Sequence, residues 1–447
     1  MPHAAALEEQ TIQTVTENSW AEMAPLPAPR SGLGVAAVDG KIYAIGGRIY
    51  QRAGDTVGTN EMYDPASNNW TLKEPMPTAR ALFGIVAYGG KIYCIGGETD
   101  NITATSHLYD AGLTVNEVYY PATDAWETKA PMPTARSNVE VNIADGKIYV
   151  MGGEPDQTLN YAYDPATDKW TVKAPVPNIG DGFNRAETSA ASATFNGKIY
   201  WIGIVGFYDY LPGMLILNQV YNPENDSWSQ RASPPDQLPG PLPEAAAVTT
   251  GVWTPERIYI FGPNKTRYLY DPSADKWAFA KYMDVTRSEF GVAVLDDKIY
   301  VIGGAYFYTA ADLNQQYTPY GYGTVGPTIL TVSPQNSTFT AKDTLIFKAN
   351  KEVTSMSYSL DGQDNVTFAG NLTLSQLSLG EHNVTVFATD TFGNIGASEV
   401  VTFTLAERTG SFSTVLLGVA VATVTGGVMG VLIYVKRKKA NLRQSKF

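Results

Sequence analysis

Charged and aromatic residues that could bind a polar ligand recur along the chain in a regular order. Arginines stand shortly before segments predicted as strands, twice within an Arg-x-Glu pair, and aromatic residues gather after glycine-ending apolar runs. Guanidinium and carboxylate groups hydrogen-bond to hydroxyls and carboxylates, and exposed aromatic rings stack on the flat faces of a sugar. The predicted ligand-binding residues are Arg30, Arg80, Arg136, Arg185, Arg287, Glu187, Glu289, Phe207, Tyr208 and Tyr306.

A structural role is the alternative for the same residues. Each arginine could tie neighbouring repeat units together, and the aromatic residues could pack on one another. Both alternatives stay open at the level of the sequence.

Residues suited to catalysis are sparse. The three histidines, His3, His107 and His382, stand in three different regions, so neither a histidine-based metal site nor a nucleophile–histidine pair is expected. Cys94 is the single cysteine, which excludes an intrachain disulfide. The sequence predicts no catalytic residue, no metal site and no cofactor, and a protein that is not an enzyme.

One repeated unit supplies the elements that would position the binding residues. Six β-forming runs share one pattern, four of them end in a glycine pair, and a Tyr-x-Pro turn ending in Trp follows the first five. The runs are GKIYAIGG (40–47), GKIYCIGG (90–97), GKIYVMGG (146–153), GKIYWIGI (197–204), ERIYIFGP (256–263) and DKIYVIGG (297–304). The turns are YDPASNNW (63–70), YYPATDAW (119–126), YDPATDKW (163–170), YNPENDSW (221–228) and YDPSADKW (270–277). Such a period predicts an all-β array of four-stranded units, a β-propeller.

The pattern closely resembles kelch repeats over about residues 18–320. The resemblance implies a propeller whose rim loops bind a ligand. Ile204 and Pro263 replace the second glycine in the fourth and fifth copies, which predicts altered connections there. Similarity to kelch sialic-acid mutarotases leaves an enzyme with an Arg and Glu mouth as a less favoured alternative.

The ends of the repeat array predict how the propeller closes. Trp20 precedes the first glycine run, whereas the last unit, QQYTPYGYG at 315–323, has no Trp. The N-terminal strand should therefore complete the sixth unit, which removes an open sheet edge. We predict a flexible segment at 1–17 and a six-bladed propeller at 18–322.

A second β-rich region is expected after a linker at 323–328. Residues 329–406 contain runs such as TLIFKA, SMSYSL, NVTVFA and VVTFTL, separated by turns. Short alternating runs of this kind predict a seven-stranded β-sandwich. The stretches YSLDGQDN and ATDTFGN resemble immunoglobulin-like modules of prokaryotic, particularly archaeal, cell-surface proteins, which implies a spacer.

The C-terminal region predicts a membrane anchor. Residues 414–435 carry no charge, and a helix of that length rises about 33 Å, enough to cross a bilayer. The basic tail at 436–447 should stay in the cytoplasm. This predicts a single-pass cell-membrane protein with the propeller and the sandwich outside the cytoplasm, although the N-terminus has no apolar signal segment.

Two further features fit that predicted location. Small residues spaced by four along the predicted helix could support a homodimer, at Gly418, Ala422, Gly426 and Gly430. Asn-x-Ser/Thr sequons cluster in the second region, and the predicted glycosylation sites are Asn336, Asn365, Asn371 and Asn383.

Charge narrows the classes of partner. The last twelve residues hold six of the 32 basic residues and no acidic one, so the rest of the chain carries a net charge of −18. A body that acidic is a poor binder of nucleic acid. The favoured hypothesis is a membrane-anchored protein that binds an extracellular glycan or protein ligand. A structural component of the cell envelope without a discrete ligand is the main alternative.

Overall fold

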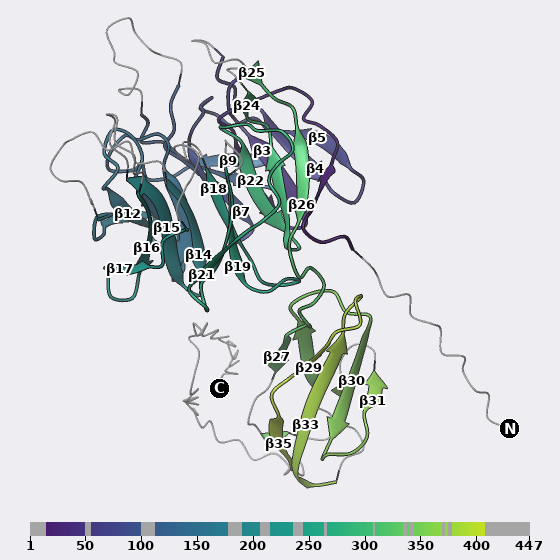
Figure 1. Cartoon of the computed structure of the whole chain (residues 1–447). Coiled ribbons are helices and arrows are strands. Elements are labelled where there is room, and N and C mark those ends of the chain that lie inside the picture. The colour runs from purple at the N-terminus through teal and green to yellow at the C-terminus, as the bar shows by residue number, and fades with distance from the viewer. Residues whose placement is uncertain are drawn as a thin grey trace, which may run out of the picture.

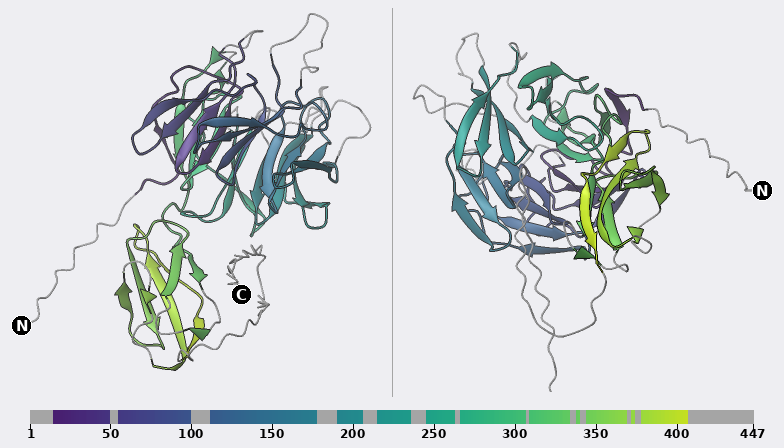
Figure 2. Two further views of the ribbon diagram at one scale, coloured as in Figure 1. Left: turned by 180° about the vertical axis from the view of Figure 1, so that it is seen from behind. Right: turned by 90° about the horizontal axis from the view of Figure 1, so that it is seen from below.

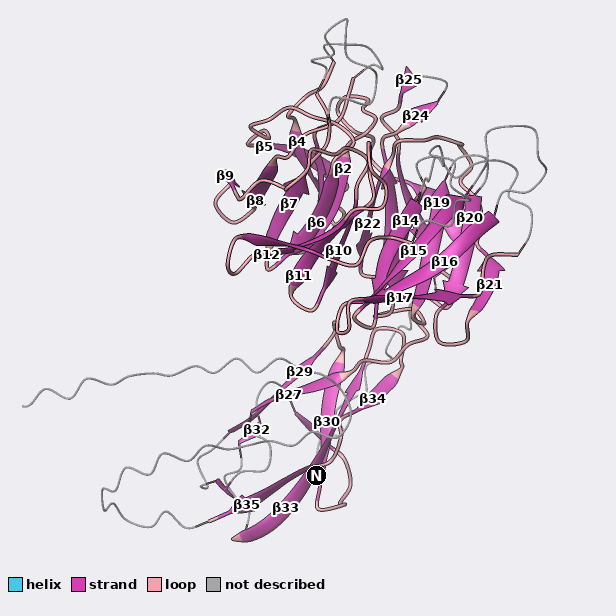
Figure 3. Cartoon of the chain, turned by 90° about the vertical axis from the view of Figure 1, so that its left-hand side faces the viewer, coloured by secondary structure: helices cyan, strands magenta, loops and turns pink. Residues whose placement is uncertain are grey.

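A computed structural model describes residues 15–49, 55–99, 112–177, 190–205, 215–235, 245–262, 266–306, 309–333, 338–339, 344–368, 372–373 and 378–406. Every regular element in these ranges is a β-strand (Figure 3). The strands fall into two groups, with β1–β26 in the upper part of Figure 1 and β27–β35 in the lower part.

The first group consists of six four-stranded antiparallel sheets, which we number in chain order. Sheets 1 to 3 are β2 (Gly34–Val38), β3 (Lys41–Ile45), β4 (Asn60–Asp64) and β5 (Asn69–Lys73); β6 (Gly84–Tyr88), β7 (Lys91–Ile95), β8 (Asn116–Tyr120) and β9 (Ala125–Thr128); and β10 (Glu140–Ala144), β11 (Lys147–Met151), β12 (Asn160–Asp164) and β13 (Lys169–Val172). Sheets 4 and 5 are β14 (Ala190–Phe195), β15 (Lys198–Val205), β16 (Leu215–Asn222) and β17 (Ser227–Arg231); and β18 (Ala246–Thr250), β19 (Arg257–Gly262), β20 (Thr266–Asp271) and β21 (Lys276–Phe279). Sheet 6 is β22 (Gly291–Leu295), β23 (Lys298–Ile302), β26 (Asn314–Thr318) and β1 (Ser19–Glu22).

The sheets surround a common axis, as the view from below shows (Figure 2). The first strand of each sheet contacts the first strand of the next, and β22 of sheet 6 contacts β2 of sheet 1. The second strands are fully buried over most of their length, because they pack between neighbouring sheets. The kelch-like repeat pattern therefore produces the expected β-propeller architecture.

Tyrosines fill the space between neighbouring sheets. The tyrosine of each Lys-Ile-Tyr or Arg-Ile-Tyr run faces the tyrosine of the Tyr-x-Pro turn in the following sheet. The ring centroids of these six pairs lie 5.6–6.2 Å apart. The pairs are Tyr43–Tyr119, Tyr93–Tyr163, Tyr149–Tyr221, Tyr200–Tyr270, Tyr259–Tyr317 and Tyr300–Tyr63.

A set of hydrogen bonds, which we call the outer clamp, joins each sheet to the next and recurs six times. One or two residues after the outermost strand, a backbone N–H donates to an Asn or Asp side chain of the next sheet at 2.8–3.0 Å. The carbonyl of the same residue accepts the indole N–H of a Trp at 2.7–3.1 Å. The clamps join Ala24 to Asn68 and Trp70, Glu74 to Asp124 and Trp126, Ala130 to Asp168 and Trp170, Ala174 to Asp226 and Trp228, Ala232 to Asp275 and Trp277, and Lys281 to Asn18 and Trp20.

The N-terminal strand closes the ring, as the missing Trp of the last unit predicts. β1 pairs antiparallel with β26, so that Trp20 lies opposite Tyr317. The Trp20 ring also contacts Phe261 of sheet 5 at a centroid distance of 5.3 Å. Sheet 6 thus takes its strands from both ends of the repeat array.

The two faces of the ring are built differently. The face that holds the glycine pairs and the arginine segments, which we call the loop face, carries the hairpin of β24 (Ala305–Tyr306) and β25 (Thr309–Ala310) at the top of Figure 1. The opposite face, the turn face, carries the turns between the first and second strands. In sheet 4, β15 extends through Ile204 to Val205, because no second glycine ends the strand there.

The second group of strands forms two further sheets below the turn face. One contains β27 (Ile329–Ser333), β29 (Thr344–Ala349) and β32 (Leu372–Thr373). The other contains β28 (Thr338–Phe339), β30 (Ser355–Leu360), β31 (Val366–Phe368), β33 (Gly380–Thr389), β34 (Ile395–Ala397) and β35 (Val401–Leu405). Alternate residues of β33, including Val384, Val386 and Ala388, are buried in its core. We call this group the second domain; its immunoglobulin-like character stays a prediction.

The predicted single-pass membrane location is wrong on the evidence of the structure. Among the described residues, no helix is long and apolar enough to cross a bilayer, since all their regular elements are strands. The segments on which the prediction rested, 414–435 with its four small residues and 436–447, lie outside the described residues.

The outer clamp of Trp20, which closes the ring, should contribute as much to stability as the clamp of Trp70. We expect Trp20→Ala and Trp70→Ala each to lower the free energy of unfolding by about 3–5 kcal/mol, because both remove a large ring packed between sheets. Denaturant unfolding of the two variants measures this. A Trp20 variant that loses much less than the Trp70 variant would show that the ring does not depend on its N-terminal strand.

The outer clamps should also make the ring sensitive to acid. Hydrogen bonds from Tyr119, Tyr163 and Tyr270 lower the pKa of Asp124, Asp168 and Asp275. A carboxyl with a lowered pKa in the folded state stabilises it above the ordinary value of about 4, and this contribution is lost as the pH falls through the lowered pKa.

The test replaces these three carboxyls by amides. Asn68 already fills the same place in sheet 1, with Tyr63 and Ala24 as its donors. The triple variant D124N/D168N/D275N should therefore unfold at a lower pH than the parent in an acid titration followed by circular dichroism. D364N, at an exposed aspartate of the second domain, is the control and should leave the midpoint in place. Equal midpoints for parent and triple variant would contradict the prediction.

Candidate functional site

Four of the predicted binding arginines lie beneath the loop face and are not part of its surface. Their side chains are at most 1% exposed, so a ligand on this face cannot reach them. They are Arg30, Arg80, Arg136 and Arg287. This corrects the prediction of an arginine rim. The reason is that each guanidinium is bound by carbonyls of its own sheet.

The same geometry recurs around each of these arginines. Arg30 donates to the carbonyls of Gly46 and Thr59 at 2.9 and 3.0 Å and to the Glu61 carboxylate at 2.5 Å. Arg80 binds the Cys94 carbonyl at 2.9 Å and pairs with Glu117. Each arginine thus links the entry of the first strand to the end of the second strand and the start of the third.

The partner on the third strand varies. Arg287 binds the neutral Gln315 at 2.5 Å, and the guanidinium of Arg136 lies over the Tyr161 ring at 4.7 Å. Burial lowers the pKa of both arginines to about 10. Both remain charged at neutral pH.

The backbone at these arginines joins neighbouring sheets. The second glycine of three of the pairs donates its N–H to the arginine carbonyl of the following sheet: Gly47 to Arg80 at 3.0 Å, Gly97 to Arg136 at 2.9 Å and Gly304 to Arg30 at 2.8 Å. A Cβ on Gly46 would lie 2.7 Å from the Arg80 carbonyl of the next sheet, and its φ is +63°. Glycine is therefore required where sheets 1 and 2 approach each other.

A belt of left-handed residues surrounds the mouth of the central channel on the loop face. Glu289, Gly32, Leu82 and Asn138 all have φ between 52° and 62°. The Gly32 N–H donates to the Glu289 carbonyl, the Leu82 N–H to the Gly32 carbonyl and the Asn138 N–H to the Leu82 carbonyl, each at 2.8 Å. These bonds connect sheet 6 through sheets 1 and 2 to sheet 3. By its spacing from Arg185, Glu187 takes the same position in sheet 4, but it lies outside the described residues.

Most polar side chains of the loop face belong to residues that the sequence analysis did not single out. The residue after three of the glycine pairs is charged and partly buried: Arg48 pairs with Glu98 across sheets 1 and 2, and Glu154 accepts a hydrogen bond from Gln157 at 2.7 Å. Asn138 of the belt is exposed, and the predicted binding residue Tyr306 is 54% exposed on the β24–β25 hairpin. The signal that could have found Arg48, Glu98 and Glu154 is the position following the glycine pair.

Several predicted site residues cannot be placed. Arg185, Glu187, Phe207 and Tyr208 lie outside the described residues, as do the sequons at Asn336 and Asn371. Asn365 and Asn383 are described, and both side chains are exposed on the second domain. In the parts of the chain that the structure describes, no group of His, Cys, Asp and Glu side chains is placed to hold a metal ion.

One carboxyl in the channel wall has a changed acidity. Glu140 begins β10 and accepts hydrogen bonds from the N–H and the hydroxyl of Ser192 on β14, at 2.9 and 2.7 Å. Burial raises its pKa to about 7, against the effect of these two bonds. The contact joins the first strands of sheets 3 and 4.

One hollow lies on the turn face, and none of the predicted binding residues that the structure describes line it. It measures about 530 Å³ and lies between the ends of β18 and β22, next to Asn350 of the second domain. Glu256 and Asp296 contribute acidic groups to its wall. It belongs to the junction of the two domains, which is described below.

The structural role of the arginines predicts a large loss of stability on mutation. Arg80→Met should lower the free energy of unfolding by about 3–5 kcal/mol, because it leaves the Glu117 carboxylate buried without its counter-ion. The double variant R80M/E117L should recover much of that loss. Arg48→Met is the control, since the Arg48–Glu98 pair is closer to solvent and should change stability by about 1 kcal/mol or less. Urea unfolding that finds R80M as stable as R48M would contradict this account.

Known proteins share these repeats. The KLHDC2/KLHL20/DRC7 Kelch-repeats domain matches residues 82–304, and the Kelch motif matches residues 29–77. The chain is 28% identical to Kelch-like protein 26 of Danio rerio over 196 residues, which cover 42% of this chain and 30% of that protein. It is 30% identical to Kelch-like protein 35 of Mus musculus over 120 residues, 27% of this chain and 19% of that protein.

A fungal relative and a solved structure agree with these matches. Kelch-like protein terF of Aspergillus terreus is 27% identical over 139 residues, 30% of each chain. The chain thus spans less than a third of the length of these curated relatives. The structure of YjhT superposes with a TM-score of 0.51 at 15% identity, covering 65% of this chain and 95% of YjhT, which shows a shared fold. From the two repeat matches and the recurring arginine, glycine and tryptophan geometry, the chain is a kelch-repeat protein.

Proposed function

We propose that the chain is a six-bladed kelch propeller that binds a protein partner through its loop face. Kelch repeats commonly mediate protein binding. The observation that carries the proposal is the difference between the two faces. The second domain occupies part of the turn face, whereas the side chains of Glu154, Asn138 and Tyr306 project from the loop face.

The charge of the loop face supports a basic segment as the partner. Arg48 is already paired with Glu98, and Asp156 and Asp312 are exposed in neighbouring connections. Acidic groups around a channel mouth attract a lysine- or arginine-rich segment. Tyr306 adds a flat apolar surface that an aliphatic or aromatic side chain could cover.

A glycan ligand is less well supported than it was by the sequence alone. That hypothesis depended on exposed arginines beside aromatic rings, and the four described arginines are buried within their own sheets. We propose that the chain is a binding protein and not an enzyme. Mutarotase-like activity in a sugar anomerisation assay would contradict this.

The test is a selection from a random peptide library displayed on phage, with the full chain as bait. We expect enrichment of lysine- and arginine-rich peptides. Tyr306→Ala combined with Glu154→Ala should weaken their binding tenfold or more, measured by fluorescence polarisation. The matched control on the turn face, Lys41→Ala, should leave the affinity unchanged.

Two results would contradict the proposal. One is a set of peptides that binds the loop-face variant as tightly as the parent but loses affinity for the turn-face variant. The other is saturable binding on a glycan array by a chain that enriches no peptide.

A further inference from the structure

The turn between the first and second strands of sheet 5 departs from the same turn in the other sheets. In sheets 1 to 4 and 6, two residues with positive φ connect the strands, as Asp39 and Gly40 do in sheet 1. In sheet 5, β18 ends at Thr250 and β19 begins at Arg257, so residues 251–256 form a longer loop. We call this segment the Trp253 loop.

A second departure, in sheet 6, holds the Trp253 loop in place. Asp297 stands where the other two-residue turns end in glycine, and it adopts the same left-handed conformation with φ 58°. Its carboxylate accepts the backbone N–H groups of residues 251, 252, 253 and 254 at 2.6–3.0 Å. The repeat pattern would allow glycine at position 297, but the chain has an aspartate there, and its side chain fixes a neighbouring loop.

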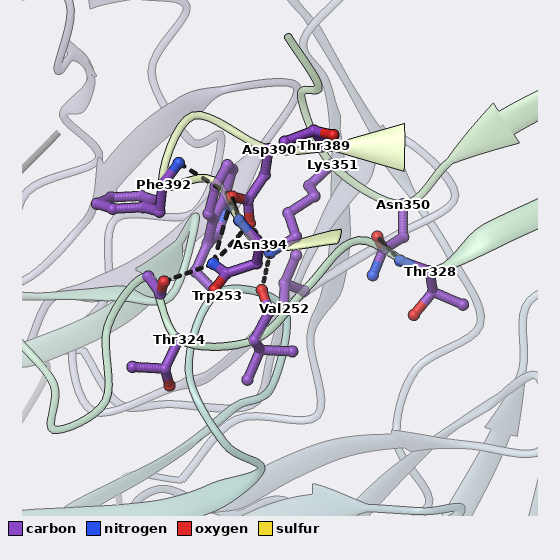
Figure 4. A network of polar contacts seen from close by, with 12 residues as sticks. Val252, Trp253, Thr324, Thr328, Asn350, Lys351, Thr389, Asp390, Phe392 and Asn394 are labelled. Carbon is purple, nitrogen blue, oxygen red and sulfur yellow. Dashed lines mark hydrogen bonds and ion pairs between the residues drawn. The ribbon is translucent and has the colours of Figure 1, made fainter. Parts of the chain in front are cut away.

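The Trp253 loop presents its indole ring to the second domain. The Lys351 ammonium lies 4.3 Å from the ring centroid, and the Phe392 ring packs against the indole edge-on at 5.8 Å. Both residues come from the second domain, as Figure 4 shows. Trp253 is only 7% exposed as a result.

The linker between the domains is bound from both sides. The Trp253 carbonyl accepts the Gly323 N–H at 2.8 Å, and Asn394 of the second domain donates its side-chain amide to the Gly323 carbonyl at 2.6 Å. Gly323 has φ +79°, and a Cβ there would lie 2.6 Å from the Phe392 ring. Lys351 also donates to the Val325 carbonyl.

A buried ion pair completes the contact. Lys351 and Asp390 lie 3.1 Å apart, with side chains 1% and 0% exposed (Figure 4). Asp390 also accepts the backbone N–H groups of Phe392 and Asn394 at 2.9 and 3.0 Å. A buried ammonium is tolerated only where its partners are fixed, so this pair holds the residues that face Trp253 in one arrangement.

We propose that the Trp253 loop is a docking element that holds the second domain of this chain in one orientation against the turn face. Domains joined by a linker move relative to one another unless their interface is extensive or specific. Here the cap at Asp297, the indole–ammonium contact and the clamped linker restrict that motion. The second domain is then a rigid support for the propeller, and both departures from the repeat pattern are explained by it.

The test measures the distance between the two domains in the full chain by electron–electron double resonance of nitroxide labels. Cys94 is fully buried, so labels can be directed to K169C on the propeller and E381C on the second domain, both exposed positions. The parent should give one narrow distance distribution. W253A and K351M should at least double its width, because each removes one half of the contact between the domains.

A matched pair of variants separates docking from folding. D297G restores the turn that other sheets use, so sheet 6 should stay intact while the Trp253 loop loses its cap and the distribution broadens. K348M, at an exposed residue of β29, should leave the distribution narrow. If W253A does not fold, the distance distributions of D297G and K351M test the proposal. A broad distribution in the parent, or a narrow one in D297G and K351M, overturns the proposal.

Discussion

The ring depends on the backbone of one residue at the outer end of each sheet. Its N–H is taken by an Asn or Asp of the next sheet and its carbonyl by a Trp, so the two polar groups of one residue fix two side chains of its neighbour. Burial of the tryptophans and tyrosines supplies the larger driving force. The backbone hydrogen bonds of the outer clamps lie near solvent, so their contribution is mainly directional: they fix which residues of successive sheets meet. The same bonds recur six times, once at each junction of the ring.

The buried arginines complement the outer clamps from the axial side. Each arginine side chain satisfies carbonyls of its own sheet, and the backbone carbonyls of Arg30, Arg80 and Arg136 each accept a bond from the sheet before. The residue is therefore shared between two units. Glu61, Glu117, Gln315 and Tyr161 serve equally well as partners, so the required feature is the fork of N–H donors and not a particular ion pair.

The sequence was informative where local pattern and packing agree. The glycine runs predicted the second strands, and the lone Trp20 predicted the N-terminal strand of sheet 6, because these motifs are local and repeated. The prediction of an arginine rim was wrong for a different reason. Spacing places Arg30 and its counterparts at the loop face, but it does not say whether a long side chain points outwards or folds back beneath the glycine pair. The docking role of Trp253 was missed because its contacts to Lys351 and Phe392 are far apart in sequence and absent from the repeat.

The closure of the ring by β1 has a consequence for biosynthesis. Trp20 and its partner Tyr317 are about 300 residues apart in the chain, so β1 leaves the ribosome long before the strand with which it pairs. Until then, β26 and β1 each present an unpaired edge, which is the feature that promotes association between chains. Sheets 1 to 5 can form in order during synthesis, since each is continuous in sequence. The final sheet must wait, and its formation converts an open stack of sheets into a ring with no exposed end.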